Sequence, residues 1–532
     1  MLTVSDVSMN YGAERLFAKT TLTFLPENCY GIIGANGAGK STFLKILSGE
    51  LEPSTGEVVL GTDCRMSILA QDQNQYDEFT VMETVLKGNA KLYDLMKQKD
   101  ALYAKEDFSD EDGILAAELE AAFAEMDGWE AESEAAKILQ GLQIPMESHE
   151  ALTGSLDGRK KVKVLLAQAL FGQPDVILLD EPTNNLDYPS VSWLEDFLLD
   201  FPGTVILVSH DRHFLNTVCT HILDIDFTKI QIYVGNYDFW YDSSKLMQRL
   251  QQDQNRKAEE KAKELRDFIA RFSANKSKAK QATSRKKLLD NLVIEDMPAS
   301  SRRYPWVSFQ AERPLGKDVL TVEGLTKTIN GVKVLDNVSF SLGREDKVAL
   351  IGENEIAQTT LFQILTGELE PDSGSYKWGV TTSQSYFPKD NSAYFTENDD
   401  NLLEWLTPYS PDPHESYLRQ FLGRMLFSGN DVFKKVKVLS GGEKVRCMLS
   451  RMMLSGANVL LLDQPTNHLD LESITALNNG LTDFKGVVMF SAHDYQFIQT
   501  IANRVMEFTE TQFIDRSMAF EDYLAMRDQY LA

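Results

Sequence analysis

Residues 34–42 read GANGAGKST and lie between the apolar run YGII and the helix-like run FLKIL. The spacing G-x-x-x-x-G-K-[ST] is that of a P-loop, in which glycines let successive backbone N–H groups converge on phosphate. A helix that follows the loop adds the positive end of its dipole. Lys40 is therefore expected to reach the β- and γ-phosphates of a nucleotide, and the Ser41 hydroxyl to bind Mg²⁺. The residues predicted to bind nucleotide are Gly34, Ala35, Asn36, Gly37, Ala38, Gly39, Lys40, Ser41 and Thr42.

Side chains downstream supply the groups that a P-loop needs for hydrolysis. The strand-like run VILLD is followed by Glu181, so Asp180 is expected in the Mg²⁺ shell and Glu181 beside the attacking water. His210 follows a second apolar run and fits a γ-phosphate sensor, with a packed histidine as the alternative. Gln71 fits a ligand of the metal and the water, with a surface-loop residue as the alternative. The predicted catalytic residues are Glu181, His210 and Gln71, and the predicted metal ligands are Ser41, Gln71 and Asp180.

The chain is a tandem repeat, because three landmarks of the first half recur in order in the second. The pairs are Gly34 with Gly352, Asp180 with Asp463, and His210 with His493, at offsets of 318, 283 and 283 residues. The offset is 35 residues smaller for the second and third pairs than for the first, so the first half carries about 35 extra residues in that interval. They fall in an acidic, helix-like arm at about 85–142. Each half alternates β-rich apolar runs with helical patterns. The sequence therefore predicts an α/β fold with two tandem P-loop NTPase domains and largely parallel sheets.

The segment between the halves, residues 240–314, has a different character. Its apolar residues recur at the 4-3-4-3 spacing of a helix-packing seam, at Ala258, Ala262, Leu265, Ile269 and Phe272. The pattern breaks at SANKSKAKQATSRKK and a short apolar set follows, which predicts an α-helical hairpin. Cations gathered at its tip favour contact with a polyanion over the alternative, a solvated linker. They are Lys276, Lys278, Lys280, Arg285, Lys286 and Lys287, and the predicted domains are 1–239, 240–314 and 315–532.

Composition restricts the surroundings and the partners of the protein. Its 532 residues include 53 Lys and Arg and 79 Asp and Glu, a net charge of −26, so no general basic surface indicates a nucleic-acid partner. The N-terminus has no signal-peptide pattern, and no apolar run approaches the roughly 18 residues that span a bilayer. The four cysteines lie far apart and form no metal-ligand pair. We expect a cytoplasmic protein with no membrane partner.

The run LSGGEKVR at 439–446 completes a set, with the P-loop and LLDEPTN, that resembles the ATP-binding-cassette superfamily. In that superfamily two cassettes pair head to tail, and a serine and two glycines of one cassette cap the nucleotide held by the other. The resemblance implies ATP and Mg²⁺ as cofactors and pairing of the two domains within one chain. It also implies that Tyr11 stacks on adenine and that Ser440, Gly441 and Gly442 cap the nucleotide.

Two cassettes in one chain, the arm, the charged hairpin and the absence of a membrane segment resemble the ABC-F family, as do PTNNLD and PTNHLD. Members of that family bind the ribosome, with the hairpin reaching toward the peptidyl-transferase region. The resemblance implies a ribosome-associated ATPase that regulates translation or protects or rescues ribosomes. Its partners would be ribosomal RNA and, as a further candidate, tRNA. The alternatives are the energy subunit of a transporter and a non-hydrolysing scaffold clamped by nucleotide.

Departures from the family pattern concentrate in one of the two predicted composite sites. LDGRKKVK at 156–163 stands opposite LSGGEKVR, with Asp157 replacing the serine and Arg159 the second glycine. The other replacements are Glu355 and Ala357 for glycines, Gln358 for the P-loop lysine, Lys389 at the position of Gln71, Gln464 for the catalytic glutamate and Ile329 at the position of Tyr11. Glu355 and Asp157 are expected to repel phosphate. Head-to-tail pairing thus leaves one competent ATPase site.

Overall fold

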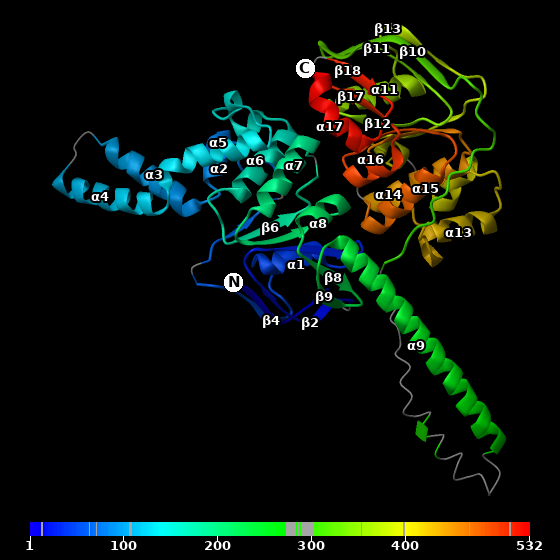
Figure 1. Ribbon diagram of the computed structural model, residues 1–532, viewed down its shortest axis with the longest axis horizontal. Helices are drawn as coiled ribbons and strands as arrows, with labels where there is room; N and C mark the ends of the chain where they lie inside the picture. The colour runs from blue at the N-terminus through cyan, green and yellow to red at the C-terminus, as the bar shows by residue number, and fades with distance from the viewer. Residues whose placement is uncertain are drawn as a thin grey trace.

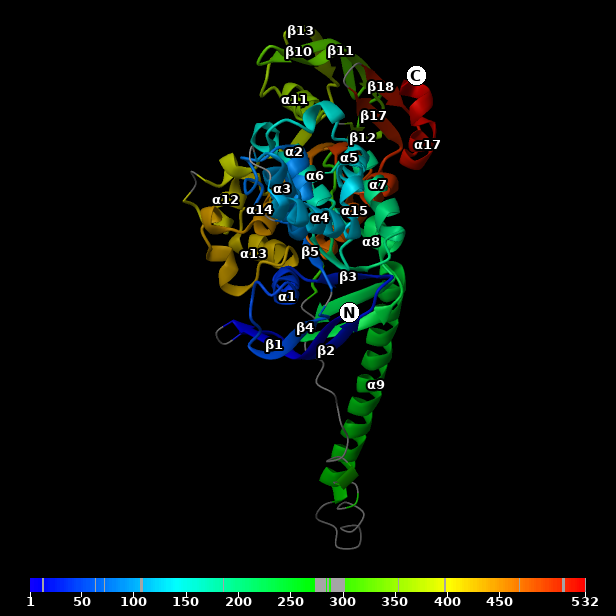
Figure 2. The same ribbon diagram turned by 90° about the vertical axis from the view of Figure 1, so that its left-hand side faces the viewer.

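The computed structural model describes residues 1–11, 14–62, 64–70, 72–105, 109–184, 186–272, 284, 287–288, 302–352, 354–396, 399–467, 469–509 and 512–531. Figure 1 shows two α/β bodies side by side, with an arm of two helices projecting from the first body. A long helix projects away from both bodies, and Figure 2 shows the same projection from the side.

A six-stranded sheet in the order β5-β6-β7-β3-β8-β9 forms the centre of the first body. All neighbours pair in parallel except β8 and β9, which are antiparallel. Its strands are β3 (Asn28–Gly34), β5 (Met66–Ile68), β6 (Val176–Asp180), β7 (Thr204–Val208), β8 (His221–Asp226) and β9 (Lys229–Val234). A second, antiparallel sheet has the order β2-β1-β4, formed by β1 (Leu2–Tyr11), β2 (Glu14–Phe24) and β4 (Thr55–Leu60). Strands buried on both faces, such as VILLD, explain the continuous apolar runs of the sequence.

The second body repeats this topology, with sheets ordered β14-β15-β16-β12-β17-β18 and β11-β10-β13. Its strands are β10 (Leu320–Ile329), β11 (Val332–Leu342), β12 (Lys347–Ile351), β13 (Ser373–Trp378), β14 (Gln384–Phe387), β15 (Val459–Asp463), β16 (Val487–Ser491), β17 (Arg504–Phe508) and β18 (Phe513–Arg516). The predicted α/β fold with two tandem P-loop domains is therefore confirmed.

Helices cover the sheets and form the arm. Those of the first half are α1 (Lys40–Leu47), α2 (Val81–Leu86), α3 (Ala90–Tyr103), α4 (Asp110–Glu125), α5 (Ala131–Gly141), α6 (Gly158–Leu170), α7 (Tyr188–Leu199) and α8 (Arg212–Val218). Those of the second are α11 (Glu355–Thr366), α12 (Leu402–Leu406), α13 (Glu415–Arg424), α14 (Gly441–Leu454), α15 (Leu471–Asp483), α16 (Tyr495–Ile501) and α17 (Phe520–Leu531). Helices α3 and α4 form the arm, within the segment expected at about 85–142.

The projecting helix is α9 (Tyr237–Phe272), 36 residues long, so the boundary expected at residue 239 falls inside a continuous helix. Ala262 and Leu265 of the predicted seam are buried. The second helix predicted for the hairpin lies almost wholly outside the described residues, as do Lys276, Lys278, Lys280, Arg285 and Lys286; Lys287 is described and exposed. Within the described ranges, no helix is long and apolar enough to cross a membrane.

A buried ionic junction joins the base of α9 to both halves. Arg302, where the described chain resumes after the hairpin, lies 2.5 Å from Oδ1 of Asp224 in β8 and 3.5 Å from Oε1 of Glu472 in α15. Trp240 of α9 donates a hydrogen bond from Nε1 to Asp224 and lies under the Arg302 guanidinium. The hydrogen bond between Trp240 and Asp224 recurs in the second half at an offset of 283 residues. There the Tyr523 hydroxyl donates to Glu507, so the repeat extends into the first turn of α9.

The junction generates a stability prediction. Replacing Arg302 by Ala leaves Asp224 and Glu472 buried without their shared cation, and removing one partner of a buried ion pair costs about 3–5 kcal/mol. We expect calorimetry to record a lower melting temperature for Arg302→Ala. Arg303→Ala removes the same charge from an exposed neighbour and is the matched control. Equal melting temperatures for the two variants would contradict the role given to the junction.

Candidate nucleotide-binding site

The loop of residues 34–39 joins β3 to α1 and folds around the side chain of Lys40. Gly37 and Gly39 have φ angles of 82° and 100°, a left-handed conformation that favours glycine. The Lys40 Nζ donates hydrogen bonds to the carbonyl oxygens of Gly34 at 2.9 Å and Ala35 at 3.3 Å. Burial lowers the pKa of Lys40, whereas the negative charge of Glu181 raises it. The loop thus holds a cation at the N-terminus of α1, where phosphate is bound in P-loops.

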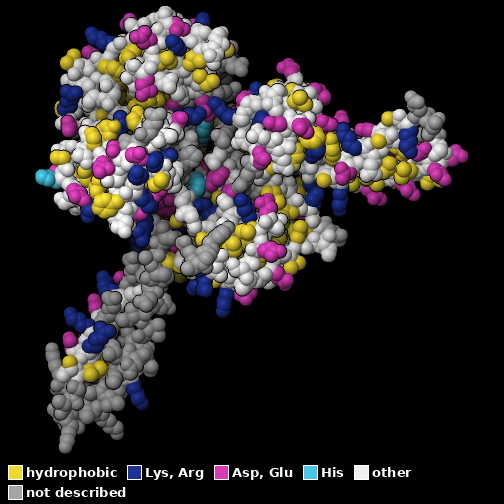
Figure 3. Space-filling model, turned by 180° about the vertical axis from the view of Figure 1, so that it is seen from behind, with side chains coloured by type: hydrophobic (Ala, Val, Ile, Leu, Met, Phe, Trp, Pro, Cys, Tyr) yellow, Lys and Arg dark blue, Asp and Glu magenta, His cyan; other side chains and the backbone are white. Residues whose placement is uncertain are grey.

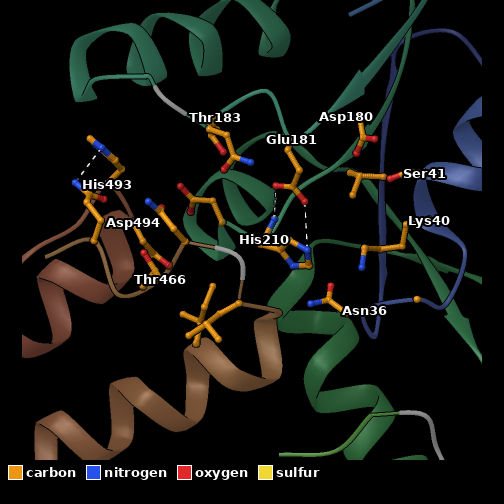
Figure 4. Close-up of a pocket in the computed structure, with 18 of the residues that line it drawn as sticks. Asn36, Lys40, Ser41, Asp180, Glu181, Thr183, His210, Thr466, His493 and Asp494 are labelled. Atoms are coloured by element: carbon orange, nitrogen blue, oxygen red, sulfur yellow. Dashed lines mark hydrogen bonds and ion pairs between the residues drawn. The ribbon is translucent and has the colours of Figure 1, made fainter. Parts of the chain in front are cut away.

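Glu181 and His210 form a hydrogen-bonded pair at the carboxyl edge of the first sheet (Figure 4). The His210 backbone N–H donates to Oε2 of Glu181 at 3.2 Å, and His210 Nε2 lies 3.3 Å from Oε1. Burial, with the charge of Asp180 next to it, raises the pKa of Glu181 to about 8. Burial lowers the pKa of His210 to about 4. A raised pKa makes the carboxylate form of Glu181 a stronger proton acceptor than an ordinary glutamate, which suits a general base.

The cavity between these groups fits a nucleotide and a metal. Its volume is about 670 Å³, within the range of small-molecule sites. Among the described residues, Nδ1 of His210 is buried and meets no hydrogen-bond partner, so it can face a ligand. Ser41 and Asp180 line the same cavity, and hydroxyl and carboxylate oxygens are the donors that Mg²⁺ prefers.

Residues of the second half close this cavity. Thr466, Asn467 and Leu469 line it and belong to the PTNHLD stretch that follows β15. The sequence pattern drew attention to this stretch, but we predicted no role for its residues. The recurrence of PTN after both acidic strands was the signal that could have identified them. The first site is therefore composite, with walls from both halves of the chain.

Some of the predicted site residues do not line the first cavity in the structure. Ser440 and Gly441 are exposed at the N-terminus of α14. Neither they nor Gly442 are among the described residues that line the cavity. Gln71 and the side chain of Tyr11, at the end of β1, lie outside the described residues. Capping by the signature, metal binding by Gln71 and adenine stacking by Tyr11 stay predictions.

The second site has the same framework with a different loop. Helix α11 begins at Glu355, whereas α1 begins at Lys40, so α11 is one turn longer at its N-terminus when the loops are aligned. Asn354 caps it, because its Oδ1 accepts a hydrogen bond from the Ala357 N–H at 3.0 Å. Gln358 Nε2 donates to the Gly352 carbonyl at 3.1 Å, the counterpart of the bond from Lys40 to Gly34. The extra turn uses backbone N–H groups that an open P-loop presents to phosphate.

The carboxylate of Glu355, which we expected to repel phosphate, is paired with side chains of the protein. Arg159 Nη2 lies 3.0 Å from its Oε2, and His493 Nε2 lies 2.8 Å from its Oε1. Lys389 Nζ also donates to Oε2. Burial raises the pKa of Glu355, but His493, Lys389 and Arg159 outweigh that effect and lower the pKa to about 2. The sequence analysis missed these partners because they come from three distant segments.

Asp463 and Asp157 of the second site also have partners within the protein. Thr359 Oγ1 donates to Oδ2 of Asp463 at 2.6 Å, and Ser491 Oγ donates to Oδ1 at 2.8 Å. The hydroxyl and carboxylate that would share a metal thus bond directly to each other. Asp157 caps α6, with Oδ1 accepting from the N–H groups of Arg159 and Lys160, so its negative charge is compensated by the helix end.

Both halves contribute to the second site and to the interface beside it. A cavity of about 730 Å³ is lined by residues 157–160 of the first half and by Gly352, Asn354, Glu355 and Gln358 of the second. The prediction that the altered signature of the first half faces the altered P-loop of the second half is confirmed. Nearby, the rings of His213 and Tyr495 stack with centroids 4.1 Å apart, and Arg212 donates to Thr475 Oγ1. The two halves therefore pair within one chain.

Two P-loop domains of the ATP-binding-cassette type in one chain define the class of this protein. The family described as ABC transporter matches residues 17–184 and 335–467, and a second family with the same description matches 223–309. The chain belongs to the ABC-F family of tandem ATP-binding-cassette proteins.

Relatives match over nearly the whole chain. The ABC transporter ATP-binding protein YkpA of Bacillus subtilis is 62% identical over 529 residues, covering 99% of this chain and 98% of the relative. The probable ATP-binding protein YbiT of Escherichia coli O157:H7 is 43% identical, with coverages of 98% and 99%. The energy-dependent translational throttle protein EttA of Haemophilus influenzae is 34% identical, with coverages of 92% and 88%. A solved structure of an RNase-L inhibitor is 17% identical with a TM-score of 0.64, over 99% of this chain and 93% of that one, and supports the fold.

Proposed function

We propose that this chain is an ATPase that binds the ribosome and hydrolyses ATP at one composite site. That site combines the P-loop of the first half with the signature of the second. The observation that carries the proposal is the convergence of Lys40, Glu181 and His210 on one cavity that the second half closes. The protein would act in the cytoplasm, where it regulates translation or protects or rescues ribosomes.

The roles within the first site follow from position and chemistry. Lys40 and the loop N–H groups neutralise the phosphates, and Glu181 accepts a hydrogen bond from the attacking water. His210, held by Glu181, turns toward the γ-phosphate. Ser41 and Asp180, with Gln71, would hold Mg²⁺, which when bound neutralises and orients the phosphates. Ser440, Gly441 and Gly442 close the site when the halves approach.

Ribosome binding has two supports. A relative at 34% identity, EttA, carries the name of a translational throttle protein, and this chain spans 88% of its length. Lys and Arg side chains also line the described part of the projection (Figure 3). Those exposed on α9 are Lys245, Arg249, Arg256, Lys257, Lys261, Lys263 and Arg266, and they are interspersed with the exposed acids Asp238, Asp242, Asp253, Glu260, Glu264 and Asp267. The excess of cations lies in the predicted tip, from Lys276 to Lys287, and on a chain with a net charge of −26 such a tip is suited to a polyanion such as ribosomal RNA.

Lys40 offers a direct test of the single working site, because Gln358 occupies the same position in the second loop. We expect Lys40→Ala to lower steady-state ATP hydrolysis at least 100-fold, since it removes the cation that neutralises the transferred phosphoryl group. Gln358→Ala should stay within about twofold of the wild type if no chemistry occurs there. Substantial turnover in Lys40→Ala, measured as phosphate release, would show that the second site works.

The hairpin tip offers the test of ribosome binding. Lys278→Glu with Lys280→Glu reverses two charges that we expect to face RNA, so co-sedimentation with ribosomes should weaken at least tenfold while ATP affinity stays unchanged. The control, Lys317→Glu with Lys377→Glu, makes the same charge change at exposed sites of the second body. The hypothesis fails if the tip variant sediments with ribosomes as well as this control does.

A further inference from the structure

The second site departs from an intact site in a correlated way. Position 355 carries the carboxylate, where the first loop has Gly37. Arg159 stands at a glycine of the facing signature, and Lys389 stands at the position of Gln71. A loop that had only lost nucleotide binding has no need of new cations around a new acid. Here two new cations and His493 converge on that acid.

The directions of these contacts correspond to those expected around a terminal phosphate. The signature approaches from the opposite half, the position of Gln71 from the side, and the histidine that recurs in both halves from the sheet edge. In the second site, each of these three directions ends on an oxygen of Glu355. Glu355 is 7% exposed, so its charge depends on these partners rather than on water.

We propose that Glu355 takes the place of a nucleotide phosphate in the second site and holds the two halves of the chain together without nucleotide. The contact that crosses between the halves is the ion pair of Arg159 with Glu355. Lys389 and His493, both from the second half, orient the carboxylate toward it. The inference concerns the second site alone and does not depend on the ribosome or on turnover at the first site.

The rest of the second site agrees with this assignment. The added turn of α11 carries Glu355 into the space between the halves, and Asn354 accepts hydrogen bonds from the N–H groups of Ala357 and Gln358. The direct bond from Thr359 to Asp463 occupies the position of a shared metal. With this side held shut, ATP has to move only the other side of the interface, where Ser440 and Gly441 are exposed.

The test measures the separation of the halves in nucleotide-free, full-length protein. Spin labels at Leu152 and Val380, exposed residues of the first and second half, report the distance by double electron–electron resonance, with Cys64 replaced by serine. We expect one narrow distance distribution for the wild type and a longer, broader one for Glu355→Gln and for Arg159→Gln. Lys91→Gln removes an exposed cation of the first half that lines neither cavity and should match the wild type.

Inorganic phosphate separates a phosphate surrogate from an ordinary ion pair. Glu355→Ala also removes the carboxylate but leaves its space open beside Arg159, Lys389 and His493, so millimolar phosphate should restore the narrow distribution in this variant. In Arg159→Gln, the cation from the opposite half is missing, and phosphate should not restore it. The proposal is overturned if Glu355→Gln matches the wild type, or if Glu355→Ala opens and phosphate leaves it open. Because neither ATP nor ribosomes are present, that failure would leave the proposed function standing.

Discussion

The ion pair of Arg159 with Glu355 spans the two halves of the chain, and the asymmetry of the molecule depends on it. A carboxylate that is almost fully buried stays charged only with cations close by, and three segments supply them. Glu355 is also the first residue of α11, which begins one turn earlier than α1 does, so the second loop is not an open phosphate loop. One site is thus complete within the protein, whereas the other presents Lys40, Glu181 and His210 to a cavity.

The hairpin and the nucleotide cavity share a second physical connection. Arg302, at the return of the hairpin, pairs with Glu472 in the first turn of α15. That helix directly follows the stretch whose Thr466 and Asn467 line the first site. Its first residue, Leu471, packs in the hydrophobic core of the first half. A change in the distance between the halves would therefore move both the base of α9 and one wall of the cavity, because the start of α15 contacts both.

Much of this architecture was predictable from the sequence. Three motifs repeated in order predict two similar domains, and apolar runs ending in acids predict parallel strands that gather Asp180, Glu181 and His210 at one edge. The longer α11 and the partners of Glu355 were not predictable, because Arg159, Lys389 and His493 are up to 334 residues apart in the chain. Contacts at that range depend on how the halves dock. Docking also decides whether Ser440 reaches the first loop, which no local pattern encodes.

Nucleotide stoichiometry tests the central claim, that the two halves form one working site, most directly. The Glu181→Gln variant, which lacks the carboxylate base, would be saturated with ATP and Mg²⁺ and its bound nucleotide counted by native mass spectrometry. The account predicts one ATP per chain, since Glu355, Gln358 and the bond from Thr359 to Asp463 leave the second loop without a phosphate site. Two ATP molecules per chain would contradict it, because the second loop would then bind nucleotide despite its own carboxylate.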